Sequence, residues 1–173
     1  MIVALVGGAR SGKSRLAVER ARSAGDPVVF VATLEPLDEE MKERAEDHRR
    51  HRPPAWKTVE APRELALALR GLSGAGCVIV DCLTLWVSNL LLSGSSPEAV
   101  VAAFDGVLEA ARKLSGQVVF VSNEVGCGLV PGTPVGRTFR DCAGLVNQRL
   151  AAVADEAYFV VAGRMLDIKG GKP

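Results

Sequence analysis

The stretch IVALVGGARSGKS, residues 2–14, decides the fold of this 173-residue chain. Its first five residues are apolar, which predicts a short buried strand. The residues that follow have the spacing G-x-x-x-x-G-K-S, and a helical pattern begins at Lys13. A strand, a glycine-rich loop and a helix in this order predict a phosphate-binding loop. The alternative is a glycine-rich turn that binds nothing, which is the weaker interpretation because every part of the motif is in register.

Each residue type in this loop can make a different interaction with a polyphosphate. Gly7 and Gly12 permit backbone conformations that a side chain would block, so that successive N–H groups can point at the anion. The start of the following helix adds the positive end of its dipole. Lys13 can reach the β and γ phosphates as a catalytic residue, and the Ser14 hydroxyl can ligate Mg²⁺. We expect the whole loop to bind a nucleotide: Gly7, Gly8, Ala9, Arg10, Ser11, Gly12, Lys13 and Ser14.

Length and charge limit the possible classes of protein. With 173 residues, 48% of them hydrophobic, we expect one domain spanning residues 1–173. Lysine and arginine total 21 against 20 acidic residues, so the net charge of +1 provides no overall field for nucleic acid or an anionic membrane. No apolar run approaches the length of a membrane span, and no signal peptide is recognisable. We expect a cytoplasmic protein with neither a nucleic-acid partner nor a membrane span.

The four cysteines fit no zinc-binding or redox spacing. A chain of this size and apolar content does not need disulfide bonds for its stability. We therefore expect Cys77, Cys82, Cys127 and Cys142 to be small buried side chains in a reducing compartment.

Short apolar runs alternate with helical patterns, which predicts a doubly wound α/β fold with a mostly parallel sheet, of the P-loop NTPase (RecA-like) type. The expected strands are residues 2–6, 28–32, 77–80, 118–121 and 158–161. The expected helices are residues 13–24, 38–51, 62–71, 83–92, 97–115 and 136–155. An extra short strand is expected at residues 56–60, and residues 167–173 could return as an edge strand.

An apolar strand, residues 77–80, ends in the carboxylate of Asp81. Such a carboxylate can hold Mg²⁺ beside the phosphate loop, because this fold class brings the carboxyl ends of its strands together. The alternative is an aspartate that caps the next helix. We favour the metal role for Asp81, shared with Ser14.

Residues 41–52 are helical by propensity but have almost no apolar stripe. A solvated surface helix is the simplest interpretation. However, the segment holds the two histidines of the chain among arginines, which would attract a triphosphate and keep an imidazole neutral as a nucleophile or base. A metal site at the two histidines is a third possibility, although no partner ligand is evident. The residues concerned are His48, Arg49, Arg50, His51 and Arg52.

Residues 123–131 follow a strand, where α/β proteins place ligand loops, although the glycines and proline could be turn residues alone. The next helix should bury Phe139, Cys142, Leu145, Val146 and Leu150 and expose Arg137, Arg140, Asp141, Asn147, Gln148 and Arg149. Arg137 or Arg140 could contact a phosphate or form a surface ion pair.

With these motifs, the chain resembles the bifunctional adenosylcobinamide kinase and adenosylcobinamide-phosphate guanylyltransferase family of cobalamin synthesis. The matching segments run in family order across nearly the whole chain: GGARSGKS (7–14), VAT (31–33), DEEM (38–41), H-x-x-x-R-P (48–53), W-x-T-x-E (56–60), DCLTLWVSNLL (81–91), SNEVGCGLVP (122–131) and FRDCAGLVNQRLAAVADE (139–156). The phosphate loop is common to many families, but H-x-x-x-R-P combined with the last two segments is specific.

The resemblance implies two reactions at one nucleotide site, with Mg²⁺ as cofactor. Adenosylcobinamide is phosphorylated with ATP or GTP, and GMP from GTP is then transferred to adenosylcobinamide phosphate through a guanylylated histidine, which maps onto His48. The resemblance also implies a homotrimer. Leu34, where the family often has serine, and residues 162–165 depart from the family pattern. The implied nucleotide contacts beyond the loop are Val31, Ala32, Thr33, Arg49, Arg50, His51, Arg52 and Glu60.

Two other functions compete with this one. A simple small-molecule kinase would need the phosphate loop, Asp81 and an acceptor pocket, but not His48. A GTP-dependent switch or RecA-like binding module is the other alternative. No Asn-Lys-x-Asp segment that reads guanine and no basic patch is present in the sequence, which argues against both forms of that class.

Overall fold

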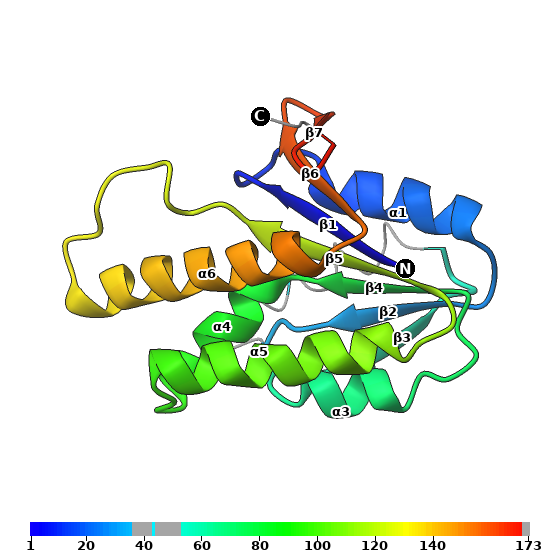
Figure 1. The fold of residues 1–173 in the computed structure, drawn as a ribbon, viewed down its shortest axis with the longest axis horizontal. Coiled ribbons are helices and arrows are strands. Elements are labelled where there is room, and N and C mark those ends of the chain that lie inside the picture. The colour runs from blue at the N-terminus through cyan, green and yellow to red at the C-terminus, as the bar shows by residue number, and fades with distance from the viewer. Residues whose placement is uncertain (36–42, 44–52, 171–173) are drawn as a thin grey trace.

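A seven-stranded sheet forms the centre of the molecule in the computed structural model, which describes residues 1–35, 43 and 53–170 (Figure 1). The strand order is β3-β2-β4-β5-β1-β6-β7, and every neighbouring pair is parallel except β6 and β7. The predicted mostly parallel sheet is therefore confirmed. The strands are β1 (Ile2–Gly7), β2 (Val28–Ala32), β3 (Lys57–Glu60), β4 (Cys77–Asp81), β5 (Gln117–Asn123), β6 (Glu156–Val161) and β7 (Arg164–Asp167).

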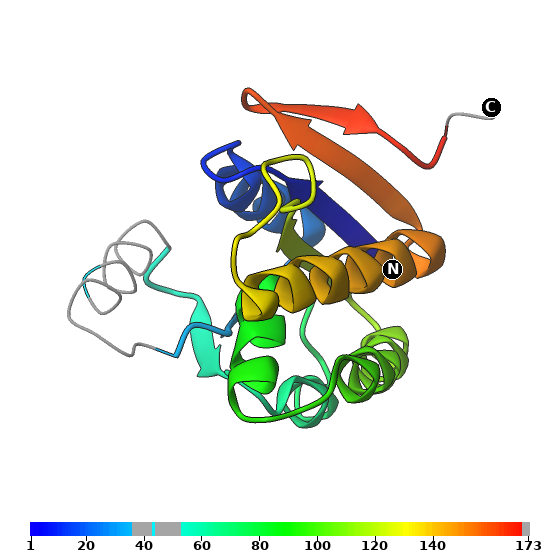
Figure 2. The ribbon, with the colours of Figure 1, turned by 90° about the vertical axis from the view of Figure 1, so that its left-hand side faces the viewer.

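Helices cover both faces of this sheet, as Figures 1 and 2 show. One face packs against α3 (Leu65–Arg70), α4 (Leu83–Leu92), α5 (Pro97–Arg112) and α6 (Pro134–Val153). The other face packs against α1 (Lys13–Ala24). Along β1, Ala4 belongs to the first core and Val3 and Leu5 to the second. The strand is apolar without interruption because successive side chains point to opposite faces and both faces are covered.

Several element boundaries differ from those expected. The helix α6 begins at Pro134 and not at residue 136, because the Thr133 hydroxyl accepts a hydrogen bond from the Gly136 N–H and proline suits the first helical position. The helix α5 ends at Arg112, since the chain then turns to enter β5. The last strand is Arg164–Asp167, earlier than expected, because Ala162 and Gly163 with φ of 49° and 75° make a tight hairpin after β6.

Two side chains expected in the core are exposed. Cys127 lies on the surface of the loop after β5, while the other three cysteines are buried. Leu145 is 48% exposed on α6, and its place on the buried face is taken by Asn147. The expected helix at residues 38–51 lies outside the described residues. Within the described part of the chain, no helix combines the length and the apolar character needed to cross a bilayer.

Candidate nucleotide-binding and metal site

The glycine-rich loop joins the end of β1 to the start of α1, and its two outer glycines are required for different reasons. Gly12 has a φ of 100°, a left-handed conformation that favours glycine. At Gly7 the reason is space: a Cβ atom would lie 2.2 Å from the carbonyl oxygen of Val160 on the neighbouring strand β6. The expected conformational role thus holds for Gly12, whereas Gly7 allows two strands to approach closely.

Lys13 is 6% exposed and folds back over the start of the loop. Its Nζ donates hydrogen bonds to the carbonyl oxygens of Gly7 (2.9 Å) and Gly8 (2.7 Å) and to Ser11 Oγ (3.3 Å). Burial lowers the pKa of the Lys13 ammonium from its usual range, and interactions with Cys82 and Asp81 oppose this shift. A phosphate at the loop would offer a buried ammonium charged acceptors in place of neutral ones.

Asp81, the last residue of β4, carries a carboxylate oxygen with an unusual environment. Oδ2 of Asp81 is buried and has no hydrogen-bond partner among the described residues. The N-cap of α4 is Cys82, so Asp81 does not cap that helix, and the capping alternative is wrong. A buried carboxylate needs a hydrogen bond or a cation, and oxygen ligands are those that Mg²⁺ prefers. The environment of Asp81 therefore fits a Mg²⁺ ligand; Ser14, the other predicted ligand, lies half-buried in the first turn of α1.

The thiol of Cys82 lies next to this carboxylate but is not a nucleophile. Burial, and then the charge of Asp81, raise the pKa of Cys82 to about 11. At neutral pH the side chain is therefore a neutral thiol, and its Sγ lies 3.2 Å from Thr84 Oγ1.

Thr33, predicted to contact the nucleotide, holds the ends of β2 and β4 together. Its hydroxyl donates to the Cys82 carbonyl (2.7 Å) and accepts from the Cys82 N–H (2.8 Å). The side chains of Thr33 and Val31 are fully buried, so a nucleotide contact at these two residues would have to use backbone atoms. Ala32 is half-buried, and it lies in register with the exposed residue Glu60 at the same edge of the sheet.

The remaining predicted contacts belong to two segments of the chain. His48, Arg49, Arg50, His51 and Arg52 lie outside the described residues, and their roles stay predictions. On α6, Arg137 donates to the carbonyl oxygens of Pro131 and Gly132, and Arg140 pairs with Asp141 at 2.9 Å. Arg140 thus forms an ion pair, as in the second alternative, whereas the partners of Arg137 are neutral carbonyl oxygens.

Sequence reasoning missed a buried amide at the end of β5. Asn147 was expected on the exposed face of α6, but it is buried, and it accepts from Ser122 Oγ (2.6 Å) and donates to the carbonyl oxygen of Asn123 (3.0 Å). Asn123 in turn donates to Thr84 Oγ1 (3.0 Å) on α4. The spacing of residues 143, 146, 147 and 150 along one helical face could have revealed this position. These bonds fix the end of β5 between two helices.

The residue after β5, Glu124, lies against the phosphate loop. Its backbone N–H donates to the carbonyl oxygen of Gly7 at 2.9 Å, and its Oε1 accepts from the Gly126 N–H at 2.6 Å. Together with the loop it borders a cavity of about 340 Å³. The lining residues are Gly8, Ala9, Arg10, Ser11, Glu124, Cys127, Phe159, Val160, Val161 and Ala162.

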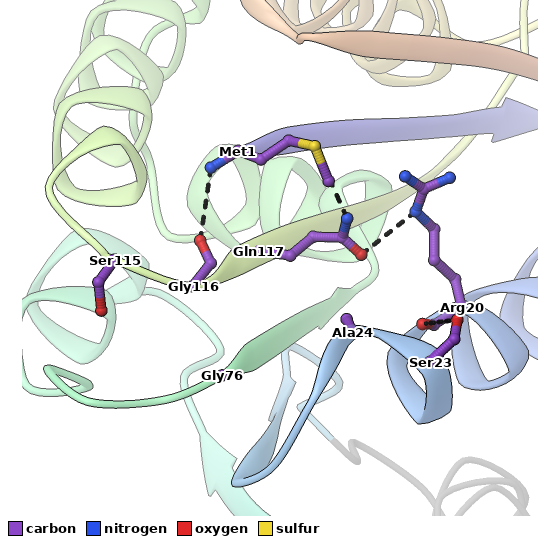
Figure 3. A pocket seen from close by; sticks show the side chains of 8 residues that line it. All are labelled: Met1, Arg20, Ser23, Ala24, Gly76, Ser115, Gly116 and Gln117. Carbon is purple, nitrogen blue, oxygen red and sulfur yellow. Dashed lines mark hydrogen bonds between the residues drawn. The ribbon is translucent and has the colours of Figure 1, made fainter.

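A larger hollow of about 570 Å³ lies at the other edge of the sheet, near Met1 and at the first residue of β5, Gln117 (Figure 3). Its arginine, Arg20, already donates to Gln117 Oε1 at 3.2 Å and to Glu156 Oε1 at 2.6 Å. These paired groups offer little to a charged ligand, and the hollow is distant from the loop along the strands. We assign the site to the edge that carries Lys13 and Asp81.

Solved structures share this fold. An ATPase of the type III secretion system of pathogenic bacteria matches 91% of this chain and 50% of its own chain, with a TM-score of 0.58 and 14% identity. EscN, the corresponding ATPase of enteropathogenic Escherichia coli, matches 93% of this chain and 43% of its own chain, with a TM-score of 0.59 and 14% identity. At this identity the likeness concerns the fold alone, and it confirms the predicted P-loop (RecA-like) type.

Sequence comparison identifies the family. The bifunctional adenosylcobalamin biosynthesis protein CobP of Pseudomonas aeruginosa is 42% identical over 167 residues, which cover 96% of each chain. CobU of Salmonella typhimurium is 41% identical over 182 aligned positions, covering 98% of this chain and all of that protein. Residues 3–168 match the family described as cobinamide kinase / cobinamide phosphate guanyltransferase. The protein that carries the Lys13 and Asp81 site is therefore a member of the cobinamide kinase / cobinamide phosphate guanyltransferase family.

Proposed function

We propose that the two activities of this family share one nucleotide site, at the edge of the sheet that carries Lys13 and Asp81. In the first reaction the γ-phosphoryl group of ATP or GTP passes to a hydroxyl of adenosylcobinamide. In the second, GMP from GTP passes to adenosylcobinamide phosphate, giving adenosylcobinamide-GDP and pyrophosphate. The observation that carries this proposal is the buried ammonium of Lys13 against the backbone of a phosphate loop, together with Oδ2 of Asp81, which is buried without a hydrogen bond from the described residues at the end of a strand of the same parallel sheet.

The residues of the loop have distinct tasks in this proposal. Lys13 exchanges its bonds to Gly7, Gly8 and Ser11 for the phosphates, and the first N–H groups of α1 add their dipoles. Ser14 and Asp81 would hold Mg²⁺, which supplies positive charge to neutralise the departing phosphate. Positioning and charge stabilisation are what phosphoryl transfer chiefly requires of a protein.

Transfer of GMP needs a further group, and we propose His48 for it. A neutral imidazole nitrogen attacks the α phosphorus of GTP, an N–P bond forms, and the bond to pyrophosphate breaks. A phosphate oxygen of adenosylcobinamide phosphate then attacks the same phosphorus, and the N–P bond breaks. Two displacements thus replace one difficult step. His48 lies outside the described residues, so the support for this role is its place in the sequence motif H-x-x-x-R-P.

The test is covalent labelling with α-labelled GTP, with His51 as the matched control. A phosphoramidate is stable in alkali and labile in acid. We expect the label on the wild type and on His51→Ala to survive alkali and to be lost in acid, and we expect none on His48→Ala. His48→Ala should still phosphorylate adenosylcobinamide. If the label is lost only in His51→Ala, His51 is the guanylylated residue. If the wild type carries no label, the covalent route is wrong and the simple-kinase alternative is favoured.

The proposal also includes one domain, a cytoplasmic location and a homotrimer. Exposed apolar side chains around the loop after β5 support self-association, with Leu129 96%, Val130 66% and Val135 64% exposed. Light scattering on the purified protein measures the number of subunits, and a monomer at micromolar concentration would contradict the trimer.

A further inference from the structure

The carboxylate of Glu124 has no part in the function proposed so far, although it lies at the phosphate loop. It is half-buried and borders the cavity of about 340 Å³ beside residues 8–11. Among the described residues that line this cavity, it is the one carboxylate. The other wall consists mainly of apolar residues at the end of β6, Phe159, Val160 and Val161. A cavity with one carboxylate and an apolar wall can receive an organic acceptor next to a phosphate.

The hydrogen bonds of the loop indicate which phosphate this cavity adjoins. A phosphate-loop lysine reaches the β and γ phosphates, and Lys13 Nζ lies against the carbonyl oxygens of Gly7 and Gly8. Glu124 donates its N–H to the same oxygen of Gly7, and Gly8 lines the cavity. The cavity is therefore next to the γ-phosphate end of the loop, where an acceptor must stand for in-line transfer.

Asp81, another acidic residue of the described part of the chain, interacts with Lys13 of the loop but has a different environment. It lies at the end of β4, which β5 separates from β1, and its buried oxygen fits a metal ligand. An oxygen atom that ligates a cation is not free to contact an acceptor hydroxyl. Glu124 remains available for that task.

We propose that Glu124 is the general base of the kinase reaction, a proposal that rests on a hydroxyl acceptor at the shared site. Its carboxylate takes the proton of the acceptor hydroxyl as the new O–P bond forms. The bond between the γ phosphorus and the β–γ bridging oxygen breaks, and the nucleoside diphosphate leaves with that electron pair. The carboxylic acid then returns its proton to water.

The second reaction provides an internal control. Its attacking group is a phosphate oxygen, and a phosphate monoester has lost most of its protons at neutral pH. No base is needed there. Removal of the base should thus slow phosphorylation and leave guanylyl transfer to adenosylcobinamide phosphate intact.

Glutamine separates this role from a structural one. Glu124 Oε1 accepts the Gly126 N–H and so shapes its own loop. Glu124→Gln keeps this acceptor oxygen and removes the charge. We expect the kinase kcat to fall by about 10²-fold, a typical loss for a missing general base, with KM for both substrates nearly unchanged. Glu109→Gln, the same change at an exposed position on α5, should behave as the wild type.

The two proposals fail in distinguishable ways. If Glu124→Gln phosphorylates adenosylcobinamide at the wild-type rate, Glu124 is not the base. This conclusion does not depend on whether α-labelled GTP labels the protein. If guanylyl transfer from adenosylcobinamide phosphate falls as far as phosphorylation, Glu124 has a structural role, and the proposal is overturned. Absence of the acid-labile label would overturn the histidine route alone.

Cys127 offers a second measurement, which does not depend on turnover. Of the four cysteines it alone is exposed, and it lines the same cavity as Glu124. With a non-hydrolysable GTP analogue present, addition of adenosylcobinamide should slow the alkylation of Cys127 by iodoacetamide several-fold, as followed by mass spectrometry. An unchanged rate would put the acceptor outside this cavity and overturn the proposal.

Discussion

The side chain of Lys13 and the backbone of Glu124 donate hydrogen bonds to one atom, the carbonyl oxygen of Gly7, each at 2.9 Å. These residues belong to distant parts of the sequence. They meet because β5 pairs with β1 in parallel, with Asn123 in register with Gly7. The strand pairing therefore brings the backbone of Glu124 to the end of the loop that Lys13 contacts.

Lys13→Met should abolish both activities, because both proposed reactions use the same phosphate loop. Loss of one preorganised donor typically costs about 10²–10³ in rate. Methionine preserves most of the buried side-chain volume but removes the hydrogen bonds to Gly7, Gly8 and Ser11, so the Tm without nucleotide is measured beside the rates to show that the variant folds. Rates of phosphorylation and of guanylyl transfer, with Arg22→Met on the same helix as control, measure the effect. Retention of either activity would contradict a shared site.

Asp81→Asn should weaken the binding of the divalent cation while the fold persists. The amide has the shape of the carboxylate but not its charge, and within the described part of the chain Oδ2 of Asp81 makes no hydrogen bond that the change would break, so the protein should still fold. We expect Mg²⁺-dependent turnover to fall by about 10²-fold or more. Binding of Mn²⁺ in the presence of GTP, followed by electron paramagnetic resonance, provides a readout besides activity. Unchanged Mn²⁺ affinity would rule out the ligand role.

Asn147→Ala should destabilise the protein and impair the kinase reaction more than guanylyl transfer. The change leaves the Ser122 hydroxyl and the Asn123 carbonyl without their buried partner, at a cost of about 1–3 kcal/mol each. It also loosens the end of β5 directly before Glu124. Thermal unfolding and the two rates check this, with the exposed Gln148→Ala as control. If the rates of both reactions fall equally, the variant acts through its lower stability and not through the position of Glu124.

Glu156→Gln should lower the Tm at neutral pH but not in acid. Hydrogen bonds from Arg20 and then Tyr158 lower the pKa of Glu156 from its ordinary value of 4.5. The stabilisation is therefore present above that value and is lost as the pH falls through the lower pKa of the folded state. For a partly exposed pair we expect a Tm difference of about 1–3 °C at pH 7. A difference that persists unchanged in acid would contradict this explanation.

Elements with a strong local signal could be predicted closely. The expected bounds of α1, β2 and α4 agree with the structure. The start of α1 could be predicted because the helix begins where the phosphate-loop motif reaches Lys13. The bounds of β2 could be predicted because its five residues are all apolar. The boundaries of α5 and α6 were less accurate, because a helix end depends on caps and on the path to the next strand.

The site was predictable only where its chemistry is local. Gly12 and Lys13 belong to one continuous motif, and the spacing of that motif by itself indicates phosphate binding. The reason for Gly7 was not visible, because the carbonyl oxygen that excludes a Cβ atom belongs to Val160 on another strand. For Asn147, helical spacing contained a signal, but its partners at Ser122 and Asn123 depend on the packing of α6 against the sheet.

The amino-acid sequence by itself determined the phosphate loop, the alternation of strands and helices and the family, because these depend on residues close together in the chain or on their order. The tertiary structure alone decided that β5 lies between β1 and β4. That order brings Glu124 to Gly7, and Oδ2 of Asp81 at the end of β4 is buried without a hydrogen bond from any described residue. Strands that are distant in sequence pair in the order that lets helices cover both faces of the sheet. No single segment of the chain specifies that order.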